Sequence, residues 1–365
     1  MVPGLRPHHV LLSSLRADRV RGADQASRSG GRAAAGRLTP TLRGANIWIM
    51  SDPIRHHYLA IFYLNRWAGG DGLVCRFSRP FGEKVVFKRV SPKGTAFEEH
   101  LYSMHSASGL PVPDMERDFM ARLDSEAADA LTQLDVGLPD SKWDTRLRSA
   151  WSRFVWAQSI RTPSEIAQLK SSVKEEWCKA RPELQERYSE RRPSNAPENV
   201  DDYYASIDPY QEDRFALSIA CQSMDHSGII EILNNMHWKV IDFSECGIQL
   251  LTSDRPVWMT ASLLEADAFI MMPIGPSRLF VAAREATTVQ RILAHNRRQQ
   301  AKEINKISAM HAVEFVFGAD ETARKLIEKH LATRRHATHM ERLAAMRGLT
   351  ILADNSPLKA GQPDE

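Results

Sequence analysis

Hydrophobic positions along the chain change their spacing several times, and these changes divide the sequence into strand-like and helix-like blocks. Two short runs rich in β-branched and aromatic residues, Leu73–Ser78 and Lys84–Val90, flank the turn-forming residues 79–83. This arrangement predicts a β-hairpin with a longer loop. An aromatic-rich segment, residues 56–67, precedes the hairpin and ends in a glycine-rich turn. The first third of the folded chain is therefore expected to be partly β.

After the hairpin, apolar residues recur at the three- and four-residue spacing of amphipathic helices. One stripe covers residues 115–134 and a second covers residues 143–155. A third helix is expected to begin at Thr162-Pro163, because threonine caps helix N-termini and proline fits the first turn. Pro182 is expected to stop or kink this helix, since proline has no amide hydrogen to donate at an interior position.

The second half of the chain changes from helix to strand. Residues 191–208 are rich in Pro, Asn, Asp and Ser and indicate an exposed loop, after which residues 209–236 predict two helices. Strand-like runs follow at Trp238–Phe243, Ile248–Thr252, Phe269–Ile274 and Arg278–Ala282. A long helix is expected from about Glu285, and Val313–Phe317 is expected to form one more strand. The pattern predicts an α+β fold: a helix-rich domain with an N-terminal β-hairpin and a small antiparallel sheet in the C-terminal half.

Charge and composition separate an N-terminal leader from the folded body. The first 49 residues hold eight arginines, no lysine and two aspartates, so the chain's net charge of +3 leaves about −3 for the rest. The leader has few large apolar side chains and is interpreted as disordered, or as sequence upstream of a start at Met50. Its arginine-rich, acid-poor composition also resembles an organellar transit peptide. Residues 50–350 are expected to form a single α+β domain, and residues 351–365 a flexible tail.

Several classes of protein find no support in the sequence. No run of eighteen apolar residues is present, so no membrane association is expected. The four cysteines lie far apart and form no CxxC pair, which argues against a disulfide framework or a structural zinc site and favours a reducing, cytoplasmic location. The phosphate-loop, GxSxG, HExxH and GxGxxG motifs are absent. The sequence therefore identifies no cofactor and predicts no metal site.

Five short motifs follow one another in an order that resembles a known bacterial family, the domain of unknown function 4238. They are His57–Trp67, an acidic helix from Glu116, Phe154–Pro163 with Gln158 and Arg161, Trp238 with Thr252–Pro256, and Asn305 with Ala312–Val316. The resemblance covers nearly all residues from His56 to Gly318. In one departure, Ala60 stands where the family usually has proline. The resemblance supports the fold and its boundaries, and it implies no activity.

The motifs single out polar residues that admit two interpretations each. Asp254 follows a predicted strand, where a carboxylate can serve as acid, base or metal ligand, or can simply bond the backbone beyond the turn, as can Ser253. His57 lies beside aromatic residues and can transfer protons near neutral pH, or hydrogen-bond a carbonyl as a partly buried ring.

Arg161 and Gln158 share one face at the end of the second helix, close to Phe154. An arginine beside aromatic packing needs an anionic partner. That partner is either a carboxylate of the protein, with Glu116 and Asp254 as the candidates, or a bound phosphate or carboxylate. Arg161 also suits the negative end of the helix dipole.

Two hypotheses of function follow. In the first, these residues converge in a cleft between the helical and the strand blocks of a hydrolase-like cytosolic enzyme, whose partner is a phosphate-containing ligand or a nucleic acid. Its catalytic residues are His57, Asp254 and Glu116, and its substrate-binding residues are Arg161, Gln158 and Ser253. In the second, the same residues form a structural hydrogen-bond network, and the protein is a non-catalytic binding or interaction protein. The sequence leaves open whether the protein is an enzyme.

Overall fold

The computed structural model describes residues 54–109, 115, 119–137, 143–334, 337–338 and 341–342. The predicted leader, the predicted tail and Glu116 lie outside these residues. The described part of the chain divides into two compact units: residues 176–203 together with Ile54, and residues 55–175 together with those from Tyr204 onward. Within the described ranges, no helix combines the length and the hydrophobicity needed to cross a membrane.

The larger unit combines helices with antiparallel sheets, which confirms the α+β class. Its helices, including those that continue into the smaller unit, are α2 (Ile61–Leu64), α3 (Ala121–Val136), α4 (Thr145–Gln158), α5 (Pro163–Arg191), α6 (Val200–Ile207), α7 (Gln211–Met224), α8 (Ser227–Asn234), α9 (Ala286–Ala294), α10 (Arg297–His311) and α11 (Arg324–His330). Short 3-10 turns lie at Asn65–Trp67, Pro92–Gly94 and Ser244–Cys246.

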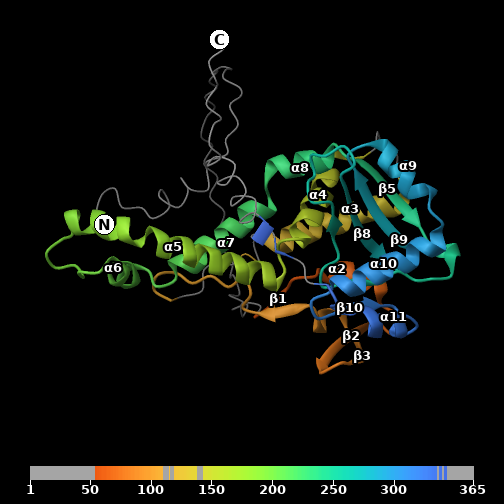
Figure 1. Cartoon of the computed structure of the whole chain (residues 1–365), viewed down its shortest axis with the longest axis horizontal. Coiled ribbons are helices and arrows are strands. Elements are labelled where there is room, and N and C mark those ends of the chain that lie inside the picture. The colour runs from red at the N-terminus through yellow and green to blue at the C-terminus, as the bar shows by residue number, and fades with distance from the viewer. Residues whose placement is uncertain are drawn as a thin grey trace, which may run out of the picture. The chain divides into compact units, whose positions relative to one another are not determined.

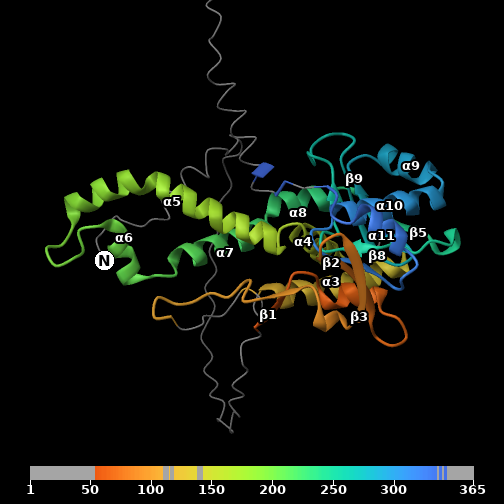
Figure 2. The same cartoon turned by 60° about the horizontal axis from the view of Figure 1, so that its bottom comes forward.

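The predicted N-terminal hairpin is present, and it belongs to a larger sheet. Strands β2 (Val74–Phe81) and β3 (Lys84–Val90) pair antiparallel, and β10 (Val316–Gly318) joins β2 to β6 (Thr252–Ser253). The strand order is β3-β2-β10-β6, so the two ends of the folded chain share one sheet. Helices α10 and α11 pack against this sheet, as both views show (Figures 1 and 2).

A two-stranded ribbon lies beside the start of the folded chain. Strand β1 (Arg55–His57) pairs antiparallel with β4 (Phe97–Glu99). The chain then turns at Ala60, whose φ of −60° is the value that proline would impose. The loss of the family's proline therefore leaves the turn in a proline-like conformation.

The second sheet is the small antiparallel sheet that the strand pattern predicted in the C-terminal half. Its order is β5-β9-β8-β7, with β5 (His237–Asp242), β9 (Arg278–Ala283), β8 (Phe269–Gly275) and β7 (Trp258–Met259). All neighbouring pairs are antiparallel. The short strand β7 had no clear signal in the sequence, because two residues are too few to show a period.

Helices cover both faces of this sheet, because side chains alternate along each strand. On β9, Phe280 packs into the main core with α4, where it meets the Trp151 ring at 5.6 Å between centroids. Its neighbours Leu279 and Val281 pack on the other face, with α9 and α10 (Figure 1). The sheet therefore lies between two helical layers.

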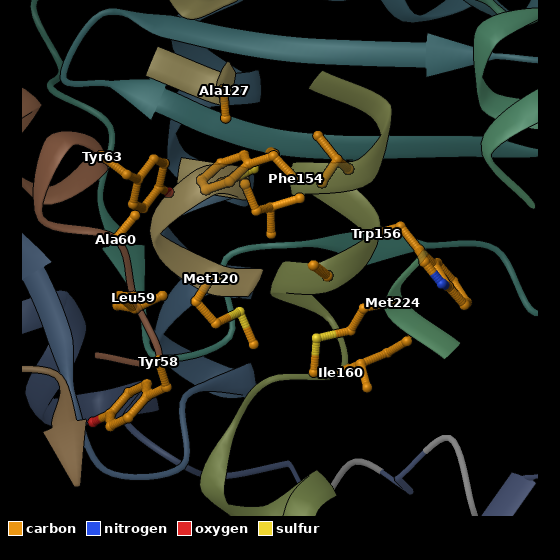
Figure 3. Packing of buried hydrophobic residues seen from close by; sticks show 14 of the residues in the cluster. Tyr58, Leu59, Ala60, Tyr63, Met120, Ala127, Phe154, Trp156, Ile160 and Met224 are labelled. Carbon is orange, nitrogen blue, oxygen red and sulfur yellow. The ribbon is translucent and has the colours of Figure 1, made fainter. Parts of the chain in front are cut away.

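The main core joins residues from before and after the polar loop at 191–208. Figure 3 shows Leu59, Ala60 and Tyr63 packed against Met120 and other apolar side chains of α3 and α4. The core also includes Met224 of α7 and strand residues of the second sheet. This core thus holds α3, α4, α7 and one face of the second sheet together, and two smaller clusters pack the first sheet and the other face of the second sheet.

One helix prediction was wrong at its boundary, and for another helix one of two alternatives, a stop at Pro182, is excluded. The expected long helix from Glu285 is two helices, because Asn296 interrupts it and caps α10 by accepting a hydrogen bond from the Gln299 amide at 3.1 Å. Helix α5 continues through Pro182 to Arg191. Buried residues beyond the proline, such as Tyr188, supply packing that offsets the lost backbone hydrogen bond.

Two further expectations were corrected. Residues 200–207, predicted as loop, form helix α6, whose start Asn199 caps by accepting from the Asp201 amide at 2.7 Å. Of the strand expected at Ile248–Thr252, only Thr252 is in a strand. The Leu251 amide instead donates to the Asn305 side chain at 2.8 Å, so a side chain takes the place of a neighbouring strand.

The smaller unit contains the C-terminal part of α5 and the start of α6. Within it, Arg181 forms an ion pair with Asp201 at 2.8 Å, and the rings of Tyr188 and Tyr203 lie 4.9 Å apart. The Tyr188 hydroxyl donates to the Pro197 carbonyl at 2.6 Å. These contacts hold the turn between the two helices.

Candidate functional site

Arg161 lies at the end of α4, where the helix meets the Thr162-Pro163 start of α5. Arg161 is fully enclosed, with 0% of its surface exposed. The guanidinium Nη1 donates to Asp124 Oδ1 at 2.8 Å, and Nε donates to the Tyr58 carbonyl at 3.0 Å. It also lies 5.4 Å from the centre of the Phe154 ring. The anionic partner of Arg161 is therefore Asp124, and not Asp254.

Asp124 is partly exposed: 25% of its side chain reaches solvent. Burial raises the pKa of its carboxyl group, and the attraction of Arg161 acts in the opposite direction. Such a pair is stable only while both charges are present, because either one alone would be left in a poorly hydrated place.

His57 belongs to the same group. Its Nε2 donates to the Lys93 carbonyl at 3.2 Å, and its ring meets Phe97 edge-on, with 5.7 Å between centroids. Burial lowers the pKa of the imidazole, and the nearby Arg161 lowers it further, while Asp124 raises it. His57 thus lies close enough to Arg161 and Asp124 for their charges to act on it.

Gln158 and Tyr102 complete the surroundings of Arg161. The Gln158 residue is 1% exposed, and its side-chain oxygen accepts from the Arg161 guanidinium when the amide is oriented toward it. The Tyr102 hydroxyl donates to the Arg161 carbonyl, and the Tyr102 amide donates to His56 Nδ1 at 2.8 Å. The side chains of Gln158 and Tyr102 thus hold the junction between α4 and α5 in one conformation.

Asp254 lies just after β6 and is 5% exposed. Its carboxylate accepts three backbone hydrogen bonds, from the amides of Val313 at 2.8 Å, Glu314 at 2.6 Å and Phe315 at 2.9 Å. Burial raises the pKa of this carboxyl group, and the three amides act in the opposite direction. Asp254 thus anchors the segment that leads into β10.

Ser253 serves the local turn. Its hydroxyl donates to the Arg255 carbonyl at 3.0 Å and accepts from the Arg255 amide at 3.2 Å. Arg255 in turn donates to the Ser164 hydroxyl at 2.9 Å, at the start of α5. In the described part of the chain, no hydrogen bond or ion pair joins Asp254 or Ser253 directly to His57 or Arg161.

Two cavities share Thr162 in their lining. A cavity of about 260 Å³ is bounded by residues 162–164, by Asp254 and Glu314, and by the rings of Tyr58, Phe97 and Phe315. A smaller one of about 90 Å³ is lined by Gln158, Glu165, Arg255 and His311 among others. The candidate residues thus fall into two groups, one enclosed around Arg161 and one beside the larger cavity.

Two residues of these groups, Asp124 and Tyr58, were not predicted as site residues. Asp124 lies 37 positions from Arg161, and nothing in the local spacing links the two. Tyr58 was part of the first motif. The sequence did not show that its carbonyl binds Arg161 while the same residue lines the cavity. Glu116, expected to be catalytic, lies outside the described residues. Across the described ranges, no three His, Cys, Asp or Glu side chains gather as metal ligands do.

The fold and the site define an α+β protein with an enclosed arginine network beside an open cavity. The chain belongs to the family described as protein of unknown function (DUF4238), whose model matches residues 55–322. This confirms the resemblance seen in the motifs. No curated protein and no solved structure matches the chain.

Proposed function

We propose that the protein is a non-catalytic binding protein in which the polar motif residues form a structural network beside a ligand cavity. One observation carries the proposal: the Arg161 guanidinium is fully enclosed and already bonded to Asp124 and the Tyr58 carbonyl. An arginine that binds a substrate phosphate needs N–H groups that reach the ligand. The neighbours of Arg161 occupy that space.

Asp254 supports the same conclusion. A general acid or base must exchange protons with a substrate, whereas both oxygens of the Asp254 carboxyl group are already bonded by backbone amides. Other polar residues, among them Thr162, Ser164 and Glu314, line the cavity next to Asp254. Tyr58 links the two regions, because its carbonyl belongs to the network and its ring to the cavity.

The structural role is tested with two carboxylates of the same cavity. We expect Asp254→Ala to lower the free energy of unfolding by about 3 kcal/mol, since three amides lose a charged acceptor. Glu314→Ala, at an exposed position, is the matched control and is expected to stay within about 0.5 kcal/mol of the parent. Urea unfolding measures both. Equal stability of the Asp254→Ala variant and the parent would contradict the network.

The binding role is tested with a panel of small fragments. We expect members of the panel to shift the backbone amide resonances of Thr162, Ser164 and Phe315 saturably, and to be recovered unchanged. A panel in which nothing shifts these amides argues against a ligand cavity. Consumption of a fragment by the protein argues for an enzyme.

A hydrolase-like function is the second proposal, favoured by one observation. His57 is only partly buried, and burial lowers its pKa, which keeps the imidazole neutral and able to accept a proton. The substrate would be a phosphate ester or a nucleic acid. Hydrolysis of a phosphodiester by the protein, lost in His57→Gln with unchanged melting, would replace the binding proposal with this one.

We further propose that the protein works in the cytosol of a bacterial cell. The four cysteines Cys75, Cys178, Cys221 and Cys246 are all free thiols. Free thiols persist where glutathione and thioredoxin keep the compartment reducing.

A further inference from the structure

The cavity beside Asp254 has an unusual distribution of charge. Three carboxylates belong to its lining, those of Glu98, Asp254 and Glu314, while none of its lining residues is an arginine, lysine or histidine. Glu98 and Glu314 are exposed and stand at its edge, and Asp254 is buried at its inner side. A cavity lined in this way presents a negative potential to whatever enters it.

The carboxylates of the cavity act on the hydroxyl of Tyr58. Burial raises the pKa of Tyr58, and the charges of Asp254, Glu314 and Glu98 raise it further. The charge of Arg76 acts in the opposite direction. Three nearby carboxylates thus act on this hydroxyl against one arginine.

The same hydroxyl lacks a partner. The Tyr58 residue is 94% buried, being 6% exposed, yet among the described residues nothing forms a hydrogen bond to its hydroxyl. Figure 3 shows the ring at the edge of the core cluster, with the oxygen directed away from Leu59 and Met120. Among the described residues, the Tyr58 oxygen is not one of the fully buried atoms without a partner, so it is accessible and can accept a hydrogen bond from a ligand.

The aromatic walls give the cavity an apolar surface. The guanidinium of Arg55 lies 4.8 Å from the centre of the Phe97 ring, and that of Arg76 lies 4.7 Å from the centre of the Phe315 ring. Each ring thus already carries an arginine of the protein, and it offers a ligand apolar contact and no cation–π site of its own. The rings give apolar contact to a short alkyl chain, while the carboxylates face its charged end.

We propose that this cavity binds a small organic cation, a primary ammonium or guanidinium group on a short alkyl chain. The ligand's N–H groups donate to the Tyr58 oxygen and to the carboxylates, and its chain packs on the aromatic rings. The volume of about 260 Å³ lies just below the range of about 300–1,000 Å³ usual for ligand pockets, which favours a ligand of this size. The proposal rests on the binding function proposed above and names its ligand class.

The test is a titration of the full chain with four probes of equal length: butylammonium, butylguanidinium, butanol and butyrate. We expect saturable shifts of the amide resonances of Thr162, Ser164 and Phe315 with the two cations, and affinities at least about tenfold weaker for butanol and butyrate. Butyrate binding as tightly as butylammonium would overturn the charge assignment and leave the binding function intact. Silence of all four probes, together with the wider panel, would remove the binding function itself.

Matched variants separate the charge from the hydroxyl. Glu314→Gln removes one carboxylate at an exposed position, and we expect it to weaken butylammonium binding about 3- to 10-fold, whereas Glu83→Gln on the β2–β3 turn leaves it unchanged. Tyr58→Phe keeps the ring and is expected to weaken binding by a similar factor, with Tyr210→Phe as its control. Unchanged affinity in both Glu314→Gln and Tyr58→Phe would overturn the proposal. Melting curves verify that each variant is folded.

A final arm distinguishes two sources of the same chemistry. The cation is either a free amine or the side chain of a basic residue on a protein partner. Tighter binding of butylammonium than of the peptide Gly-Gly-Lys-Gly would identify the free amine. Tighter binding of the peptide would identify a protein partner, since backbone groups then add contacts at the exposed edge formed by Glu98 and Glu314.

Discussion

Helix α3 carries an aspartate–arginine contact near each of its ends, and the two contacts differ in how much water reaches them. Near its start, Asp124 pairs with Arg161, whose side chain has no exposed surface. Near its end, Asp135 pairs with Arg66 and Arg278, whose side chains keep 26% and 31% of their surface exposed. The chemical groups are the same, so the two contacts differ in burial and in the number of arginines.

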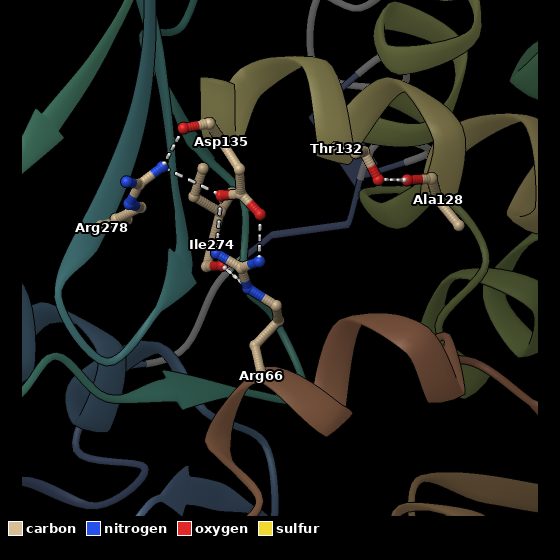
Figure 4. A network of polar contacts seen from close by, with 6 residues as sticks. All are labelled: Arg66, Ala128, Thr132, Asp135, Ile274 and Arg278. Carbon is tan, nitrogen blue, oxygen red and sulfur yellow. Dashed lines mark hydrogen bonds and ion pairs between the residues drawn. The ribbon is translucent and has the colours of Figure 1, made fainter. Parts of the chain in front are cut away.

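The second contact is the richer one in hydrogen bonds. Figure 4 shows Asp135 between the two arginines: Arg66 Nη2 donates to its Oδ1 at 2.9 Å, and Arg278 Nη1 donates to the same oxygen at 3.0 Å. Arg66 Nε also donates to the Ile274 carbonyl at 2.9 Å. This group ties α3 to the 3-10 turn at residues 65–67 and to the second sheet.

The number of contacts does not by itself decide which region tolerates change. A charge left alone in a dry place is destabilising, whereas a charge at the surface regains water. The Asp124–Arg161 contact has fewer bonds than the Asp135 contact, and we expect it to be the more critical one. By the same argument, the partly exposed Asp135 group contributes less than its bonds suggest.

The largest effect is expected from Arg161→Met, which removes the enclosed charge and keeps the length of the side chain. We expect the free energy of unfolding to fall by about 3 kcal/mol, the lower end of the range for a broken buried pair, because Asp124 keeps 25% exposure. Urea unfolding measures the loss. The double variant Arg161→Met/Asp124→Leu is expected to recover part of it, since no unpaired carboxylate remains. A loss below about 1 kcal/mol in the single variant would show that both contacts behave alike.

A smaller effect is expected from Asp135→Asn at the other end of the helix. We expect a loss of about 1 kcal/mol, because both arginines are close enough to the surface to be hydrated. The control is Asp129→Asn, an exposed position of the same helix, with no measurable change expected. Repeating the measurement in 1 M salt is expected to shrink the difference from the parent, because ions screen exposed charges. A loss equal to that of Arg161→Met would contradict the role assigned to water.

Much of the fold followed from the spacing of apolar residues. The stripes of α3 and α4, the hairpin β2–β3 and the strands β5, β8 and β9 were all predicted, because each buries one regular face. The errors fell where a single polar side chain decides the structure. Asn296 divides the last long helix, and Asn305 replaces a strand neighbour at Leu251, and neither effect has a period.

The candidate site was predictable only in part. The motifs named Arg161, Gln158 and His57, and the structure brings these three together. Asp124 was not foreseen, because a contact over 37 positions depends on how α3 packs on α4. The catalytic and substrate-binding roles expected for these residues stay predictions. What the motifs did indicate is which polar residues the fold gathers at the start of α5.

The smallest effect, and the most specific to the enclosed group, is expected from the titration of His57. Burial holds its pKa below the ordinary value of 6.5. Below pH 6.5 the unfolded chain therefore takes up a proton that the folded chain does not, and stability falls as the pH falls. Above pH 6.5 the imidazole is neutral in both states and contributes no dependence on pH.

In His57→Gln this part of the acid-side loss is expected to disappear. Melting temperatures from pH 5 to 8 measure it as the difference between parent and variant, which cancels the groups they share. His295→Gln, at an exposed position, is expected to keep the parent's slope. Parallel curves for the parent and His57→Gln would mean that His57 titrates alike in both states, and that burial around Arg161 does not extend to the histidine.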